Sequence, residues 1–246
     1  MTTTNPDLLK DIKQQNDYCG VTACHTSGIT GKGVIVWDME SYPGSKEHGA
    51  KTTQRILDAA PDATVICASP NIVMSETEVK TATVLSDGVM YEMEDFIRKY
   101  NIKILTRSVG GSFCQGTASY NFWKTLQDKY RLIILNSMGN EGDEQKTKDD
   151  RIAIMVGACG LIKGKPKRDQ YSSTGIDIDF IDFRGWDSGT SFSTPYLAGK
   201  AALLAQVYSD ITHQEAYEYF KANSEDIQKQ GFNIYTGYGL PIMRNG

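Results

Sequence analysis

A serine at the start of an apolar segment is the residue best suited to nucleophilic chemistry in this chain. Ser191 lies in the sequence GTSFSTP, and the apolar, helix-forming residues 196–204 follow it, which predicts a helix that begins near the serine. The first-turn N–H groups of a helix lack partners within the helix and its dipole is positive there, so negative charge forming beside Ser191 would be stabilised. Pro195 agrees with this placement, since proline is tolerated in a first turn. Ser191 is therefore the candidate nucleophile.

A serine hydroxyl attacks poorly unless a base removes its proton and a third group orients that base. The chain has three histidines. His213 follows Thr212 in a capping pattern and His25 lies in a polar stretch, so we interpret both as ordinary exposed or loop residues. His48 instead opens a segment in which apolar residues recur at helical spacing over 50–60. This placement makes His48 the candidate general base.

An aspartate follows the first buried strand that the sequence predicts. Residues 33–37 form a short apolar run, and Asp38 comes directly after it. Functional groups gather at the carboxyl ends of strands in open α/β sheets, although an isolated aspartate here would be interpreted as a turn residue. We expect Asp38 to accept a hydrogen bond from one ring nitrogen of His48, while the other nitrogen faces Ser191.

The order of these three residues along the chain resembles that of the subtilisin-like serine protease family. The resemblance rests on an aspartate block at 33–40, a histidine block at 48–52 and a serine block at 189–199, of which the serine block is the most specific. It extends from about residue 31 to residue 240. It implies a catalytic triad and a serine endopeptidase that works through an acyl-enzyme intermediate.

Two further blocks resemble the family between the triad residues. The segment 132–142 is a predicted buried strand with a polar turn and resembles the oxyanion-hole block, which implies that the Asn140 amide and the Ser191 N–H stabilise the oxyanion. The segment 104–111 resembles the strand that pairs with the substrate backbone. Glycines there would let another chain approach closely, and a free strand edge offers main-chain hydrogen bonds. The implied substrate-binding residues are Ser108, Val109, Gly110 and Gly111.

The predicted fold class is α/β, because predicted strands and helices alternate along the chain. At 246 residues with 40% hydrophobic content, one domain over 1–246 is expected, with 1–30 as an N-terminal lead-in segment. Among the predicted elements, residues 86–100 are expected to form one helix. The resemblance implies the particular topology, a three-layer α/β/α arrangement with a largely parallel central sheet.

Composition limits the partners that this chain is expected to have. The net charge of -4 and the lack of a basic face argue against nucleic acid, and no stretch reaches the length needed to cross a bilayer. The opening residues lack the features of a secretory signal, and five cysteines suit reduced thiols, so a cytoplasmic location is expected. The expected partner is a peptide or protein substrate. The sequence gives no indication of oligomeric state.

No cofactor is needed for the expected chemistry, and no metal site is assigned. A zinc site at Cys19, Cys24 and His25 would lack a fourth ligand at suitable spacing. Structural calcium is common in the resembling family, but no calcium site can be placed in this sequence. Two alternatives to a protease stay open: a catalytically silent subtilisin-like module that binds peptides, and a peptide ligase or cyclase.

Overall fold

A central sheet organises the molecule, for which the computed structural model describes residues 6–40, 46–75, 77–109, 116–144 and 152–244. Its strand order is β10-β8-β7-β6-β1-β2, and β9 pairs with β8 at the side. Every pairing along this order is parallel, and β9 runs antiparallel to β8. The strands are β1 (Ile35–Asp38), β2 (Thr64–Cys67), β6 (Ile104–Arg107), β7 (Ile133–Ser137), β8 (Ile154–Ile162), β9 (Lys165–Arg168) and β10 (Phe180–Phe183).

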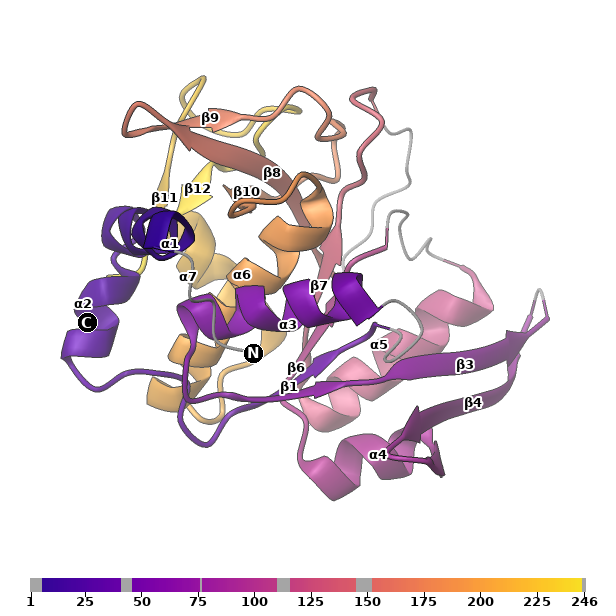
Figure 1. The fold of residues 1–246 in the computed structure, drawn as a ribbon. Coiled ribbons are helices and arrows are strands. Elements are labelled where there is room, and N and C mark those ends of the chain that lie inside the picture. Colours follow the sequence, from indigo (N-terminus) through magenta and orange to yellow (C-terminus); the bar gives the residue numbers. More distant parts are fainter. Residues whose placement is uncertain (1–5, 41–45, 76, 110–115, 145–151, 245–246) are drawn as a thin grey trace.

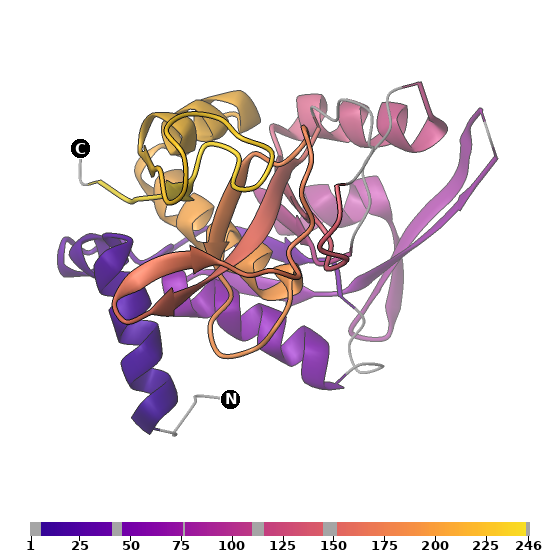
Figure 2. The ribbon, with the colours of Figure 1, turned by 90° about the horizontal axis from the view of Figure 1, so that it is seen from above.

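Helices cover both faces of this sheet, as the view from above shows (Figure 2). Successive side chains of β1 point to opposite faces of the sheet. Asp38 accepts hydrogen bonds from the helix at residues 46–59. The Trp37 ring, on the other face, contacts Phe96 and Trp123, which lie in the helices at residues 93–100 and 118–130. The expected α/β class, with a largely parallel sheet between helical layers, is confirmed. One layer contains α3 (Lys46–Ala59) and α6 (Thr190–Val207); the other contains α4 (Met93–Tyr100), α5 (Ala118–Tyr130) and α7 (His213–Ala222).

Helix α6 is the central helix of the core. Most of its residues are buried, and it contacts α3 and strands β1, β6, β7, β8 and β10. A helix that is largely apolar on all sides belongs inside a protein, which agrees with the alanine- and leucine-rich segment 197–205, whose one charged residue, Lys200, is buried in an ion pair with Asp182. The start of α6 is thereby fixed against the carboxyl ends of the central strands.

One predicted helix is shorter than expected. Residues 86–92 were expected to be helical, but β4 ends at Ser86, β5 covers Val89–Glu92, and the helix begins only at Met93. The reason is the Asp87-Gly88 pair, whose φ values of 50° and 76° form the tight turn of a β-hairpin. The hairpin belongs to an antiparallel sheet that projects from one side of the molecule (Figure 1), made of β3 (Ser69–Met74), β4 (Val79–Ser86) and β5 (Val89–Glu92).

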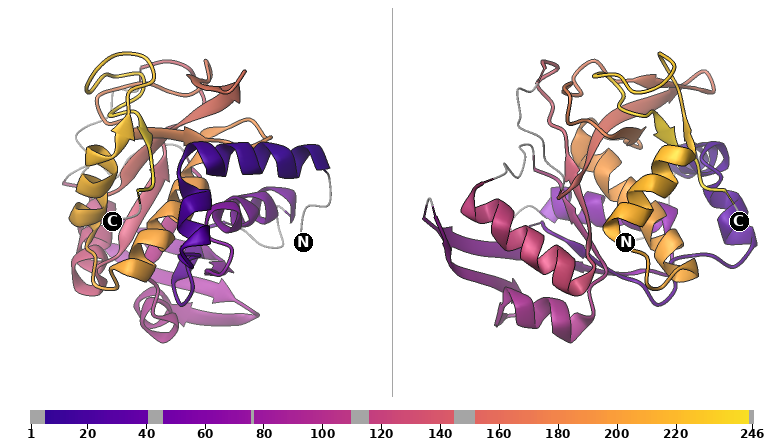
Figure 3. Two further views of the ribbon diagram at one scale, coloured as in Figure 1. Left: turned by 90° about the vertical axis from the view of Figure 1, so that its left-hand side faces the viewer. Right: turned by 180° about the vertical axis from the view of Figure 1, so that it is seen from behind.

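The N-terminal segment is helical and packs beside the C-terminal end of the chain (Figure 3). The carbonyl oxygen of Cys19, which lies between the first two helices of the chain, accepts a hydrogen bond from the N–H of Met243 at 2.7 Å. Asn16 donates to the carbonyl of Asp58 in α3. These elements are α1 (Pro6–Tyr18), α2 (Val21–Thr26) and the short pair β11 (Ser224–Glu225) and β12 (Leu240–Pro241). Among the described helices, none is both long enough and apolar enough for a bilayer span.

Two histidines that the sequence assigns to ordinary positions make specific contacts. His213 begins α7 behind the predicted capping box of Thr212 and Glu215, but it is partly buried and its Nδ1 accepts the N–H of Ile134 at 3.3 Å. The expectation of an exposed His213 was therefore wrong. The Nε2 atom of His25 lies 2.8 Å from the carbonyl of Ala59.

Candidate active site

Asp38 lies at the carboxyl end of β1 and is fully buried. Its Oδ2 atom accepts hydrogen bonds from the hydroxyls of Thr52, at 2.7 Å, and Thr53, at 3.0 Å, both in α3. Its Oδ1 atom is buried without a hydrogen-bond partner among the described residues. Burial is the main reason that the pKa of Asp38 rises to about 7, and the threonine hydroxyls oppose the rise. Asp38 therefore joins β1 to the helix that carries His48.

The imidazole of His48 projects from the first turn of α3 and is hydrogen-bonded to a carboxylate. That carboxylate belongs to Glu40: its Oε2 atom lies 3.0 Å from Nδ1 of His48. The bond to Glu40 raises the pKa of His48, burial opposes the rise, and the Asp38 charge adds to it. The sequence placed Asp38 on this ring, but the described part of the chain has no hydrogen bond between Asp38 and His48.

Ser191 is the second residue of α6, where the sequence predicted the nucleophile. Its hydroxyl donates to the carbonyl of Ser108 at 3.1 Å, and the Ser108 hydroxyl donates to the carbonyl of Ser191 at 3.0 Å. The described structure has no hydrogen bond from Ser191 to His48. The neighbouring Phe192 ring lies against the imidazole, with ring centroids 5.4 Å apart. The nucleophile and base thus occupy adjacent elements, in an arrangement that a bound substrate can tighten.

Pro195 explains why the carbonyl of Ser191 is open to Ser108. In an α-helix this carbonyl would accept the N–H four residues later, but residue 195 is proline and has none. The proline lies in the second turn, since α6 begins at Thr190, one turn deeper than expected. The hydroxyl of Ser108 supplies the missing donor and ties the end of β6 to the start of α6.

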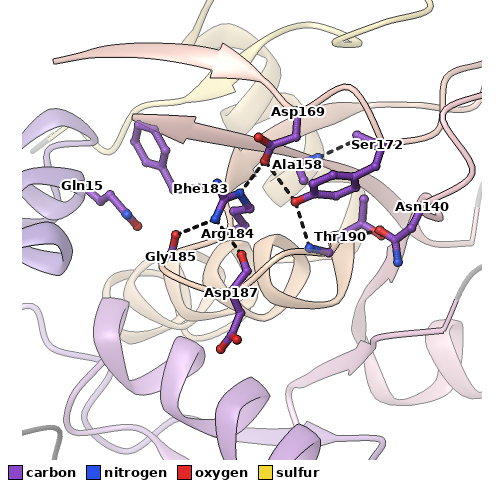
Figure 4. Close-up of polar contacts among 12 residues, drawn as sticks. Gln15, Asn140, Ala158, Asp169, Ser172, Phe183, Arg184, Gly185, Asp187 and Thr190 are labelled. Carbon is purple, nitrogen blue, oxygen red and sulfur yellow. Dashed lines mark hydrogen bonds and ion pairs between the residues drawn. The ribbon is translucent and has the colours of Figure 1, made fainter. Parts of the chain in front are cut away.

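Asn140 lies in the turn after β7 with its side-chain amide in a fixed orientation. Its Oδ1 atom accepts the backbone N–H of Thr190 at 2.8 Å and the Thr190 hydroxyl at 3.1 Å (Figure 4). The amide nitrogen therefore points away from Thr190, and Asn140 itself is exposed. Next in the chain is the N–H of Ser191, a first-turn donor of α6. Together, the amide and this N–H could donate to one oxyanion.

A polar network holds the loop that leads to Ser191. The Tyr171 hydroxyl accepts the N–H of Gly189 at 2.8 Å and donates to Asp169 at 3.0 Å. Arg184 donates to the same Asp169 oxygen at 2.7 Å and to the carbonyl of Asp187 at 2.8 Å (Figure 4). This network fixes the residues on which the geometry at the start of α6 depends.

A salt bridge joins the same loop to α3. Lys51 lies one helical turn after His48 in α3, and its Nζ atom is 3.0 Å from Oδ1 of Asp187. Both side chains are partly exposed, so the energetic contribution of the pair is small. Its geometric effect is to link the segments before the base and before the nucleophile.

Glu40 and Tyr171 are not among the site residues predicted from the sequence. Glu40 lies two residues after Asp38, in a three-residue turn closed by its N–H bond to the Asp38 carbonyl, so the alternation of strand residues does not identify it. Tyr171 meets Gly189 only through the fold, and no local pattern marks it. Of the expected substrate-binding residues, Ser108 is buried beside Ser191 and Val109 is 50% exposed, whereas Gly110 and Gly111 lie outside the described residues. Within the described ranges, no group of three or more His, Cys, Asp or Glu residues could hold a metal ion.

Comparison with known proteins identifies the family. The family model described as Peptidase_S8, Subtilase family, matches residues 38–239, which include the whole site described above. The chain belongs to the subtilase family. Subtilisin from Bacillus pumilus is 20% identical over 234 residues, covering 85% of this chain and 80% of that protein.

Solved structures of other proteases share the subtilase fold. The crystal structure of a lanthipeptide protease has a TM-score of 0.64 at 17% identity and covers 95% of this chain and 92% of its own. The structure of the prenylagaramide maturation protease PagA has a TM-score of 0.62 at 15% identity and covers 90% of this chain and 95% of its own. At these identities the likeness concerns the fold, which is therefore subtilisin-like over most of the chain.

Proposed function

We propose that this subtilase is a serine endopeptidase that cleaves peptide bonds through an acyl-enzyme intermediate. The supporting observation is the position of Ser191 in the first turn of α6, one residue before Phe192, whose ring contacts His48, and near the fixed amide of Asn140. Such a position combines a nucleophile, a base and oxyanion donors, as acyl transfer requires. Membership of the subtilase family points to the same class of enzyme.

In the proposed reaction the Ser191 hydroxyl turns from the Ser108 carbonyl toward His48 and attacks the substrate carbonyl. His48 takes the hydroxyl proton and returns it to the leaving amine, and water then hydrolyses the acyl-enzyme with His48 again acting as base. Asn140 and the N–H of Ser191 donate to the oxyanion. Asp38 contributes negative charge behind the imidazole and anchors α3 through its threonine contacts.

We propose peptides as the substrate class, bound in extended form along the segment 108–111. Two structural relatives are described as a lanthipeptide protease and a prenylagaramide maturation protease, so precursor peptides are included among the proposed substrates. No cofactor takes part in the proposed steps, and the acidic net charge of -4 gives no basis for nucleic acid as a partner. Cys19, Cys67 and Cys159 are free thiols, which supports the proposal of a reducing, cytoplasmic location.

Covalent labelling tests this proposal directly. A fluorophosphonate probe should label the wild-type protein and a Ser209→Ala control, whose serine is exposed and remote from the site, but not Ser191→Ala. Unchanged labelling of Ser191→Ala would refute the nucleophile assignment. A wild-type protein that neither reacts with the probe nor cleaves peptides, but binds them, would be a silent module. Product masses separate a peptidase from a ligase or cyclase, since only hydrolysis adds water.

A further inference from the structure

Two carboxylates lie beside His48, and the structure gives them different tasks. Glu40 follows Asp38 by two residues, and its side chain is 10% exposed. Its Oε2 atom lies 3.0 Å from Nδ1 of His48, the ring nitrogen that a triad carboxylate must hold. Oδ2 of Asp38 instead accepts from two α3 hydroxyls, while Oδ1 of Asp38 and Oε1 of Glu40 are both buried without a hydrogen-bond partner among the described residues.

The backbone of Glu40 is held by its neighbours. Its N–H donates to the Asp38 carbonyl at 2.8 Å, and its carbonyl accepts from the Cys67 thiol, with Sγ at 3.8 Å. The intervening Met39 donates its N–H to the carbonyl of Thr106 in β6 at 2.9 Å. The chain thus stays attached to both neighbouring strands beyond the end of β1. Glu40 therefore presents its carboxylate from a fixed position.

The contacts of Asp38 suit an anchor better than a partner for the ring. Thr52 and Thr53 both donate to Oδ2, which ties the second turn of α3 to β1. Burial and the nearby Glu40 charge raise the pKa of Asp38. Two carboxylates close together in a buried site do not both ionise easily. Of the two carboxylates, Glu40 is the one in direct contact with the imidazole.

We propose that Glu40 is the positioning residue that orients His48 and stabilises its protonated form, with Asp38 anchoring the helix behind it. The inference rests on the proposed function, since it concerns the base of that reaction. When Nε2 of His48 takes the Ser191 proton, the Nδ1–H bond stays intact and continues to donate to the Glu40 carboxylate. The proton then leaves from Nε2 to the amine, and the Nδ1–H bond to Glu40 stays in place throughout.

Other charged groups near the imidazole also shift the pKa of His48. The Asp38 charge behind the ring raises the pKa of His48, and Lys51, one turn along α3, lowers it. Lys51 is itself paired with Asp187 in the loop before α6. Among the described residues, the apolar ring of Phe192 also lies against the imidazole. Removing the Glu40 charge should therefore lower the pKa of His48, because its largest raising contribution comes from Glu40.

Steady-state kinetics of three variants test the assignment. Glu40→Gln should reduce kcat by about 10³- to 10⁴-fold with little change in KM, the range seen when a triad carboxylate is replaced by its amide. The acid limb of the kcat/KM profile should move to lower pH. Asp38→Asn should reduce kcat less than Glu40→Gln. Glu47→Gln removes an exposed charge one residue before His48 and should stay within about 3-fold of wild type.

The opposite ranking would overturn the proposal. If Glu40→Gln retains wild-type kcat and its acid limb, while Asp38→Asn loses the larger factor, Asp38 is the orienting carboxylate. Circular dichroism and thermal unfolding establish that each variant is folded. Should Asp38→Asn fail to fold, the comparison of Glu40→Gln with Glu47→Gln still decides, because these two variants remove the same charge with and without the His48 contact.

Proton NMR provides a readout that does not require activity. The Nδ1–H of His48, assigned by its loss in His48→Gln, should give a downfield signal in the wild type that persists in Asp38→Asn and disappears in Glu40→Gln. Persistence of this signal in Glu40→Gln would refute the proposal. A protein that shows the expected NMR pattern but no probe labelling at Ser191 would contradict the proposed function alone. Labelling at Ser191 with the signal unaffected by Glu40→Gln would contradict this inference alone.

Discussion

Gly199 of α6 lies directly against the carbonyl oxygen of Ile56 in α3. A Cβ atom on residue 199 would stand 2.5 Å from that oxygen and 2.7 Å from the Cβ of Ala59. These two helices carry the candidate nucleophile and the candidate base, and they pack on the same face of the sheet. The missing side chain of Gly199 therefore sets how closely Ser191 and His48 can approach.

Replacing Gly199 with alanine should separate the two helices. We expect a loss of about 1–3 kcal/mol in the free energy of unfolding, typical of overpacking, measured by urea denaturation. Peptide cleavage should fall by up to about 100-fold in kcat, because a displacement of about 1 Å can have that effect on catalysis. Gly160→Ala is the control, since a Cβ there meets nothing nearer than the flexible end of Arg184 at 3.4 Å. Equal behaviour of the two variants would contradict this account of helix spacing.

Replacing Asn140 with alanine should remove one oxyanion donor. We expect kcat to fall by about 10²- to 10³-fold with little change in KM, the range the subtilisin oxyanion asparagine is known for. Peptide hydrolysis under saturating substrate measures the change. Asn121→Ala, on the exposed face of α5, is the matched control and should behave as wild type. A large rise in KM at constant kcat would instead assign Asn140 to substrate binding.

Much of the fold follows from local sequence patterns. Strand β7 is buried at every residue and begins within the apolar run 132–135 of the sequence. Helix α6 begins where the Gly-Thr-Ser sequence precedes an apolar segment. The hairpin of β4 and β5 was predicted as part of a helix, because Val89 and the apolar residues after it also fit a helical period. The local signal for the hairpin is the Asp87-Gly88 turn between its two strands.

The details of the site depend on tertiary placement that the sequence does not specify. A position at the end of β1 predicts that Asp38 and Glu40 can both face α3, but which of them reaches His48 depends on where the hydroxyls of Thr52 and Thr53 lie. The local pattern led to Asp38 alone. The fold instead assigns the threonines to Asp38, which leaves Glu40 on the imidazole.

Replacing Tyr171 with phenylalanine should loosen the loop before α6. The change removes the acceptor for the Gly189 N–H and one donor to Asp169. An unsatisfied polar group of this kind destabilises a protein by about 1–3 kcal/mol, which urea denaturation can measure. We also expect slower fluorophosphonate labelling of Ser191, because the loop helps to orient the start of its helix. Tyr208→Phe, an exposed tyrosine, is the control, and matching labelling rates in the two variants would contradict the positioning role.

The partly buried His213 should make the protein less stable as the pH falls. Desolvation is the main cause that lowers its pKa from an ordinary value of 6.5 to about 4, and the Nδ1 acceptor for Ile134 would be lost on protonation. Between these values the unfolded chain binds more protons than the folded protein, so the free energy of unfolding decreases from about pH 6.5 to about pH 4. The decrease due to this residue should be at most about 3 kcal/mol.

Urea denaturation between pH 4 and pH 7 tests this with a pair of variants. His213→Gln replaces the ring by a side chain that does not titrate, so its free energy of unfolding should vary less over this range than that of the wild type. The absolute stability of His213→Gln is expected to be lower at pH 7, because the Ile134 N–H loses its ring acceptor. Gln214→Ala, which changes an exposed residue beside His213 that does not titrate, is the control and should keep the wild-type slope. If His213→Gln also keeps that slope, the acid sensitivity arises elsewhere in the protein.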